Sequence, residues 1–430
     1  MVVHFSTSDL HGGAAKAAFR LHCALRAAGS ASKMIVIEKL SDDSDVLAVA
    51  DRRVMKWRRI LLARLFPRFA WRWGGRLDFN TDLAPAVDLE PALAALGGKV
   101  DVICLHWITG LLSVRTTAAL ASRYRCPIVW VLQDLEPLTG GCHYPGSCDG
   151  FARHCGRCPQ LGSRREHDRS RVVWQRKKDS LSRLPLTLVA GSTWLSRQAR
   201  KSALWQQVQI AEISDAIDTQ VFRPFDQRAA RDLLHLPQEA HLLFFGAFSL
   251  ANPRKGMEYL LEGLRQLHAD PVLRQPSFRQ RPIHLVVAGH ENAALRNSLP
   301  FPHTAVGFLQ DNITLALAYQ AADVFLCPSV EDAGPMMIPE AMLCGTPVVA
   351  FETGIALDLI PASSTGYLAR LRDSADFSRG IVSVLTAPFP AQARDRACAT
   401  AVSRHCPSQV AAKHGALYEL LSGARERNRL

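Results

Sequence analysis

Two acidic side chains in the second half of the chain flank a short loop. Seven residues separate Asp332 from Glu340, and Gly334-Pro335 lies between them. An apolar run that ends at Cys327 precedes the loop, and a helix is predicted to begin near Met336. Carboxylates so placed can accept hydrogen bonds from hydroxyl groups, and the helix N-terminus between them favours phosphate. The plainer alternative is an exposed loop acid followed by a surface helix residue.

A basic pair lies upstream of these acids. Arg254 and Lys255 follow an apolar run over residues 242–245 and come directly before a predicted helix over 256–267. Two cations at the start of a helix can neutralise negative charge that develops on a bound group. An isolated Arg-Lys pair is commonly a solvated helix cap, so it is the surrounding pattern that favours a chemical role, with Lys255 ahead of Arg254.

Alternating strands and helices must position these groups. In both halves of the chain, short apolar runs alternate with helical patterns, which is typical of a parallel sheet covered on both faces. We predict the α/β class, with two Rossmann-like domains facing an interdomain cleft, since ligands bind at the carboxyl ends of parallel strands. The predicted strands are 2–5, 34–37, 102–105, 128–132, 187–190, 242–245, 284–288, 324–327 and 348–351, and the predicted helices are 13–28, 111–123, 193–202, 256–267, 313–321 and 337–343.

The length and composition of the chain agree with two domains. At 430 residues, the chain exceeds what one hydrophobic core usually organises. We predict an N-terminal domain over 1–215, a C-terminal domain over 216–390, and helices with a basic tail over 391–430. The 48% apolar and 21% charged residues exclude a disordered chain. The start of the chain shows no secretory signal pattern. The sequence also contains no run of about 18 apolar residues, the length that a helix needs to cross a bilayer, so we expect a cytoplasmic protein.

Polar groups also follow the predicted strands of the first half. Gly12 and Gly13 come after the first strand and open an Ala-rich helix, so their backbone N–H groups can face an anion without side-chain obstruction, although such a pair also suits a simple turn. His106, Gln133 and Asp134 end two further strands. We expect these side chains to share one sheet edge.

The stretch from Cys327 to Val349 resembles the signature of glycosyltransferase family 4, and similarity covers nearly the whole chain. The resemblance implies the GT-B architecture, retention of anomeric configuration and no catalytic metal. It implies contact of Asp332 or Glu331 with the donor sugar, and which of the two faces the sugar stays open. Glu340 would bind the ribose. The other donor-contacting residues that it implies are Lys255 and Arg254 at the pyrophosphate, Gly12, Gly13, Gly289, Phe308, Gly334, Pro335 and Met336.

The main departure from the family concerns Gln133, which stands where members commonly carry a His near the reaction centre. A glutamine can hydrogen-bond a sugar hydroxyl but cannot titrate near neutral pH. We count Gln133 among the catalytic residues, and leave open that His106, Asp134 or His143 carries part of the role.

A cysteine-rich insertion is predicted over residues 139–162. Cys142, Cys148, Cys155 and Cys158 lie within seventeen residues, and the last two form a Cys-x-x-Cys pair. A tetrahedral structural Zn²⁺ could order such a segment. Reduced thiols and a redox pair are the alternatives. Catalysis does not depend on which of the three applies.

A basic segment lies between Arg52 and Arg76. It holds nine Arg and Lys residues and no acid, interleaved with aromatic and aliphatic side chains at helical spacing. This composition favours peripheral contact with an anionic membrane surface. An ordinary helix with a solvated basic face and an RNA-stacking surface are the alternatives.

We predict a hexosyltransferase that moves a sugar from a UDP- or GDP-sugar to a lipid-linked saccharide acceptor in surface polysaccharide biosynthesis. It would lie in the cytoplasm at the inner face of the plasma membrane, attracted by the net charge of +12, with no nucleic acid as partner and an oligomeric state that the sequence leaves unknown. A GT-B epimerase or phosphorylase, and a non-catalytic protein that binds polyanions or membranes, are the rival hypotheses.

Overall fold

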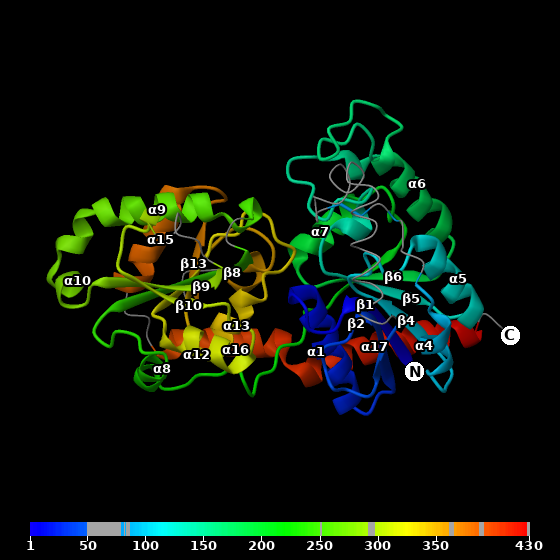
Figure 1. Cartoon of the computed structure of the whole chain (residues 1–430), viewed down its shortest axis with the longest axis horizontal. Coiled ribbons are helices and arrows are strands. Elements are labelled where there is room, and N and C mark those ends of the chain that lie inside the picture. The colour runs from blue at the N-terminus through cyan, green and yellow to red at the C-terminus, as the bar shows by residue number, and fades with distance from the viewer. Residues whose placement is uncertain are drawn as a thin grey trace, which may run out of the picture. The chain divides into compact units, whose positions relative to one another are not determined.

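A computed structural model describes residues 1–49, 79–80, 82, 87–249, 252–290, 297–360, 365–386 and 391–427. The chain divides into two compact units (Figure 1). The first comprises Met1–Gly191, Leu195–Ala216 and Pro407–Leu430, and the second comprises Ser192–Trp194 and Ile217–Cys406. The predicted basic segment over 52–76 lies outside the described residues. No helix in the described ranges is long and apolar enough to cross a membrane.

The first unit is built on a parallel sheet whose described strands run in the order β3-β2-β1-β4-β5-β6-β7. Its central strands are buried along their whole length, because helices cover both faces. The strands are β1 Val2–Ser8, β2 Ser32–Glu38, β3 Val46–Ala48, β4 Val102–Leu105, β5 Ile128–Leu132, β6 Leu186–Ala190 and β7 Gln209–Glu212. The helices are α1 Gly13–Ala27, α4 Glu90–Ala94, α5 Val114–Tyr124, η1 Glu136–Leu138, η2 Gly150–Ala152, α6 Arg169–Leu181, α7 Thr193–Lys201 and α17 Pro407–Arg427.

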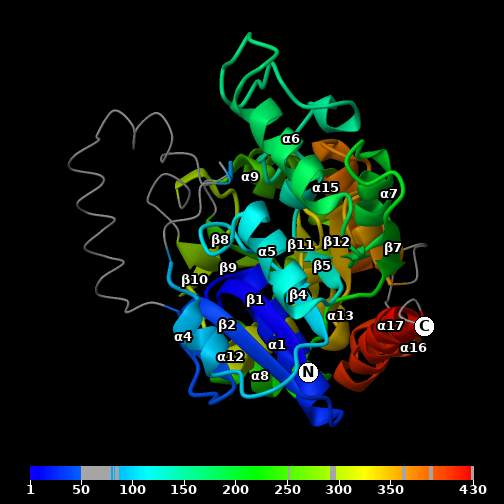
Figure 2. The ribbon, with the colours of Figure 1, turned by 90° about the vertical axis from the view of Figure 1, so that its right-hand side faces the viewer.

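The last helix, α17, belongs to the first unit although it follows the second in sequence. Val410, Ala411, Leu417 and Tyr418 are buried with α1 and with the sheet strands in one core cluster. Figures 1 and 2 show α17 beside α1. The sequence places residues 391–430 in one terminal segment, but the structure divides it at Pro407, since α16 packs on the second unit. The residue before a proline disfavours the helical conformation, which separates the two helices there.

The second unit holds a parallel sheet in the order β10-β9-β8-β11-β12-β13. One core cluster packs on each face of this sheet. The strands are β8 His241–Ser249, β9 Ile283–His290, β10 His303–Gly307, β11 Val324–Cys327, β12 Val348–Phe351 and β13 Gly366–Ala369. The helices are α8 Gln227–Leu233, η3 Pro253–Lys255, α9 Met257–Ala269, η4 Pro271–Arg274, α10 Pro276–Gln280, α12 Asn312–Ala321, α13 Met337–Leu343, α14 Ala356–Leu359, α15 Ser374–Thr386 and α16 Ala391–His405.

Candidate functional site

Asp332 lies in the loop between β11 and α13 and is paired with Lys255. Its Oδ2 atom is 2.6 Å from the Lys255 Nζ atom, and its Oδ1 accepts a hydrogen bond from the Gly334 N–H at 3.3 Å. The Lys255 side chain is 29% exposed and that of Asp332 is 9% exposed, so solvent reaches the cation more than the acid. Two of the predicted residues thus form one charged centre on the carboxyl edge of the sheet.

The loop that carries Lys255 is fixed against the loop of Asp332. The Asn252 side chain accepts from the Arg254 N–H, which starts η3. The Arg254 carbonyl accepts from the Val330 N–H at 2.8 Å, and the Arg254 guanidinium donates to the Glu331 carbonyl at 3.1 Å. Arg254 therefore serves to join the two loops, and the carbonyl of Glu331, rather than its carboxylate, takes part in this contact.

Gly256 makes this close approach feasible. Its φ angle is +68°, and a Cβ atom placed there would lie 1.8 Å from the carbonyl oxygen of Pro328. Left-handed φ values favour glycine, and the carbonyl is backbone that cannot swing aside. The glycine is thus required both by its own conformation and by its neighbour.

We expect Gly256→Ala to destabilise the second unit by well over the roughly 1–2 kcal/mol that a left-handed alanine costs. The added methyl group must push the Pro328 loop away, which separates Lys255 from Asp332. The matched control is Gly307→Ala, where φ is +70° but no heavy atom lies within 4 Å of the added Cβ. Urea unfolding of both variants measures the difference, and equal losses would mean that the two loops are not held as described.

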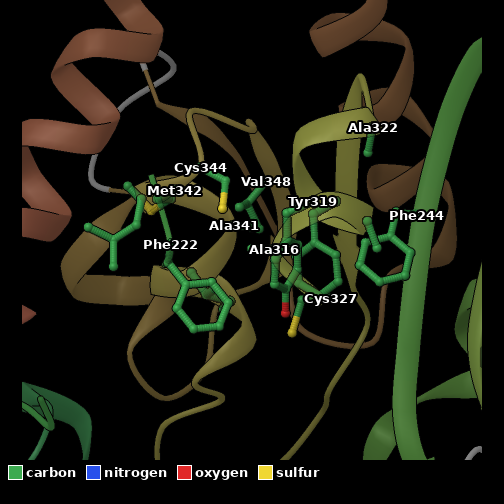
Figure 3. Packing of buried hydrophobic residues seen from close by; sticks show 14 of the residues in the cluster. Phe222, Phe244, Ala316, Tyr319, Ala322, Cys327, Ala341, Met342, Cys344 and Val348 are labelled. Carbon is green, nitrogen blue, oxygen red and sulfur yellow. The ribbon is translucent and has the colours of Figure 1, made fainter. Parts of the chain in front are cut away.

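Glu340 lies inside α13 and is 4% exposed. The hydroxyl of Tyr319, from α12, donates to its Oε2 at 3.3 Å. Burial, followed by the negative charge of Glu340, raises the pKa of Tyr319 well above its usual value, so this hydroxyl stays protonated. Figure 3 shows Tyr319 in the core beside Phe244 and Cys327. The sequence patterns did not single out Tyr319, which stands within a predicted helix as one more apolar position.

The other predicted donor contacts lie at the same end of the second sheet. Gly289 is the second-last residue of β9 and has φ +122°, and half-buried Phe308 directly follows β10. The strands are parallel, so their carboxyl ends share one edge. Gly334, Pro335 and Met336 complete the loop into α13, and Met336 is its N-terminal capping residue.

The first unit presents an open helix start. Gly12 has φ +91°, and no side chain caps α1. A Cβ atom added at Gly12 or Gly13 would have no heavy atom within 4 Å. The start of this 15-residue helix is therefore uncapped and open around both glycines, which suits an anion.

Gln133 follows β5, and its side-chain amide donates to the Asp215 Oδ1 atom at 3.3 Å. Burial raises the pKa of Asp215, which favours the neutral carboxyl over the charged one. Asp215 was not predicted, because the edge strand β7 before it mixes polar and apolar residues and gives no clear strand signal. The amide of Gln133 is thus oriented by a second side chain.

Asp134 and His143 form a buried pair. The His143 Nδ1 atom is 2.6 Å from the Asp134 Oδ2, which also accepts from the Trp107 indole N–H at 3.0 Å. Burial lowers the pKa of His143, but the charge and hydrogen bond of Asp134 outweigh it, and the net pKa is raised. Asp134 and His143, two of the three residues that could share the role of Gln133, are therefore hydrogen-bonded to each other.

His106 lies elsewhere, in the core of the first unit. Its Nε2 atom is 2.9 Å from His4 Nδ1 and 3.5 Å from the Cys104 sulfur. Among the described residues, His4, Cys104 and His106 form the group in which three possible metal-ligand atoms lie within 4.8 Å of one another. The two histidine rings are hydrogen-bonded to each other and are buried, so we interpret the group as a hydrogen-bonded core cluster and not as part of the sugar site.

A buried ion pair anchors the start of the cysteine-rich insertion. Lys177 of α6 places its Nζ atom 2.7 Å from the Glu136 Oε1 atom, and it also donates to the Thr139 carbonyl at 3.0 Å. The Lys177 side chain is 1% exposed and that of Glu136 is 5% exposed. The pair ties α6 to the segment between β5 and the insertion.

We expect Lys177→Met to destabilise the first unit by about 3–5 kcal/mol, because it leaves the Glu136 carboxylate buried without its cation. Lys178→Met is the matched control. Lys178 is exposed and its Nζ atom lies 5.3 Å from the centre of the Trp174 ring, a contact worth about 0.5–1 kcal/mol at such sites. Thermal and urea unfolding measure both losses, and a similar loss from the two variants would contradict the importance of the buried pair.

The four cysteines of the insertion are all free thiols that line one cavity. Cys142 and Cys158 are buried, while Cys148 and Cys155 are half-buried. Burial raises the pKa of the Cys155 thiol to about 11.

Comparison with known proteins adds a family match over the second unit. Residues 239–387 match the family described as glycosyl transferases group 1. D-inositol 3-phosphate glycosyltransferase 2 of Catenulispora acidiphila is 29% identical over 189 residues, which is 42% of this chain and 43% of that protein. The chain thus spans less than half the length of this curated relative.

Two solved structures share the fold of nearly the whole chain. Sucrose-phosphate synthase from Thermosynechococcus elongatus is 18% identical with a TM-score of 0.69, and the match covers 98% of this chain and 99% of that chain. The Anabaena protein HepE, solved with UDP-glucose, is 16% identical with a TM-score of 0.63 and the same coverage. These comparisons confirm the predicted fold of two Rossmann-like domains and the predicted resemblance to family 4 glycosyltransferases.

Proposed function

We propose that this chain, whose residues 239–387 match the glycosyl transferases of group 1, transfers a sugar from a nucleotide-sugar donor to an acceptor hydroxyl. The observation that carries the proposal is the pairing of Lys255 with Asp332 at the carboxyl edge of the second sheet. The cation can bind the diphosphate of a donor molecule, and the acid beside it can bind the hexose of the same molecule. The close approach of the two loops, which Gly256 permits, supports the same assignment.

The donor contacts follow from the chemistry of each group. Lys255 would neutralise the diphosphate as it departs, with Arg254 supporting the loop from which Lys255 extends. Asp332 would accept hydrogen bonds from hexose hydroxyls after the donor displaces its contact with Lys255. Glu340, oriented by the Tyr319 hydroxyl, would bind the ribose diol. The Anabaena relative in fold was solved with UDP-glucose, which supports a UDP-sugar as the first donor to test.

The first unit supplies groups suited to the reaction with the acceptor. The open start of α1 at Gly12 and Gly13 would face the phosphate, and Gln133 would bond a hydroxyl of the transferred sugar. In a retaining reaction, the acceptor oxygen bonds to the anomeric carbon on the face from which the phosphate leaves. The phosphate oxygen takes the acceptor proton, so no side chain has to act as a base.

We infer that the acceptor is a saccharide carried on a lipid, in the synthesis of a surface polysaccharide at the inner face of the plasma membrane. The nine cations between Arg52 and Arg76 support attraction to anionic lipid head groups. The net charge of +12 acts in the same direction. Replacing these cations with Gln should weaken sedimentation with anionic vesicles and leave donor binding unchanged.

A panel of UDP-, GDP- and ADP-sugars tests the proposed function. One donor should raise the free energy of unfolding by about 2.7 kcal/mol at 100 times its Kd. The same donor should then lose its sugar only when a saccharide acceptor is present. Conversion of the donor to an epimer without an acceptor would favour the rival epimerase, and no stabilisation by any nucleotide sugar would contradict the proposal.

A further inference from the structure

The stretch from Tyr144 to Asp168, which leads into α6, has too few buried side chains to hold its shape by packing alone. From Tyr144 to Asp168 the buried residues are Pro145, Phe151 and Cys158, and the regular structure is the short η2. Figures 1 and 2 show this stretch as a loop that projects beyond α6. Fixing each residue costs about 1–2 kcal/mol of backbone entropy, so a loop of this length requires another source of order.

The four thiols of the loop converge on a single cavity. Cys142, Cys148, Cys155 and Cys158 line a space of about 20 Å³ together with Phe151. A volume of roughly 10–15 Å³ already admits one water-sized particle. The cavity is therefore large enough for a metal ion and is lined by sulfur on several sides.

Backbone N–H groups point at the sulfur atoms. The Gly140 N–H donates to Cys155 Sγ at 3.1 Å, and the Gly150 N–H donates to Cys148 Sγ at 3.5 Å. Those of Gln160 and Leu161 reach the sulfur of Cys158. Hydrogen bonds to the ligand atoms orient thiolates around a metal and stabilise their charge.

Glycines allow the chain to close around the thiols. A Cβ atom at Gly140 would lie 2.2 Å from the Ser170 carbonyl oxygen and 2.8 Å from the Cβ of Cys155. Gly156, between the two cysteines of the Cys-x-x-Cys pair, has φ +130°, and a Cβ atom there would lie 2.3 Å from the Glu166 carbonyl oxygen. The turn between Cys155 and Cys158 is thus specified by backbone geometry.

We propose that Cys142, Cys148, Cys155 and Cys158 bind one structural Zn²⁺ as a tetrathiolate site. Four thiolates suit tetrahedral zinc, and each thiol would lose its proton to solvent on binding. Among the described residues, only His4, Cys104 and His106 bring three ligand atoms within 4.8 Å of one another. The four sulfur atoms of the insertion are farther apart, so they must move closer together to bind one ion. By ordering the chain next to Thr139, the ion would also position His143 beside Asp134.

Metal analysis of the full chain is the first test. Protein produced with zinc should contain about one Zn²⁺ per chain, released when an organomercurial blocks the thiols. Replacement by Co²⁺ should give the strong charge-transfer absorption of four thiolates, which a site made of two histidines and one cysteine cannot give. The proposal would be overturned if the four thiols reacted equally fast with and without zinc. It would also be overturned if the mass of the protein were lower by two hydrogens for each disulfide, because the cysteines would then be oxidised.

Variants locate the ion without relying on activity. Cys148→Ser and Cys155→Ser should lower bound zinc from about one to near zero per chain and raise the rate of tryptic cleavage after exposed Arg153 and Arg157. Cys398→Ser, a half-buried thiol of the second unit, is the control and should keep the zinc. Zinc that survives Cys148→Ser but is lost in Cys104→Ser would place the ion in the core cluster instead and defeat the proposal.

Discussion

Replacing Lys255 with alanine is expected to lower the rate constant of sugar transfer by about 10²–10³-fold, the effect of removing one group that stabilises charge in a transition state. The ammonium group is the partly exposed member of the Lys255–Asp332 pair and is free to turn from the acid to a diphosphate. The charge on the diphosphate grows as the bond to the sugar breaks, so kcat should fall more than KM rises. Steady-state kinetics with the donor found in the panel measures both.

Asp332→Asn and Arg265→Ala separate this chemistry from general effects of charge. Asp332→Asn keeps the shape of the loop but removes the acid, and it should weaken donor binding while Lys255 remains. Arg265 is a 54% exposed residue of α9, and its removal should leave kcat within about twofold, as expected of a solvated charge. If Lys255→Ala retained full activity in a correctly folded protein, the proposed role of the pair would be wrong.

Acid is expected to unfold the first unit steeply below pH 6. Burial lowers the pKa of His4 well below its usual value and lowers those of His106 and His414 to about 3. In the unfolded chain these histidines bind protons near pH 6.5, whereas in the folded chain they stay neutral until the pH approaches 3. The free energy of unfolding is therefore highest above pH 6.5 and falls as the pH drops towards 3. Each histidine contributes a slope of up to about 1.4 kcal/mol per pH unit, and the three together about 4.

Urea unfolding between pH 7.5 and pH 4.5 measures this slope, and the fluorescence of buried Trp130 and Trp205 reports on the first unit. His414→Leu should reduce the slope by up to about 1.4 kcal/mol per pH unit, because α17 then brings no histidine ring into the core. His167→Gln, at an exposed position of the insertion, is the control. If His414→Leu left the slope unchanged, the pKa of His414 would not be lowered in the folded chain, and the prediction would be wrong.

Much of the second unit could be predicted from the sequence. The apolar runs over 324–327 and 348–351 coincide with β11 and β12, and the predicted helix over 337–343 coincides with α13. Local patterns sufficed there because these strands are buried on both faces. Strands β10 and β13 were missed, since β10 mixes half-buried and exposed residues and β13 begins with glycine.

The partners of the predicted site residues were harder to predict. The sequence places Lys255 and Asp332 in separate loops, and only the parallel order of β8 and β11 brings these loops side by side. Tyr319 and Asp215 contact Glu340 and Gln133 from elements distant in sequence. Such contacts depend on register and packing across the sheet, which the periodicity of a single segment does not encode.

The return of α17 to the first unit has a consequence for synthesis on the ribosome. The second unit can complete its fold as soon as residues up to Cys406 have emerged, whereas the first must wait for the last stretch of chain. Until then, the apolar side chains that α17 helps to bury, among them Leu21 and Leu25 of α1, stay open to chaperones. A premature stop codon near position 407 would therefore damage the part of the molecule that is translated first.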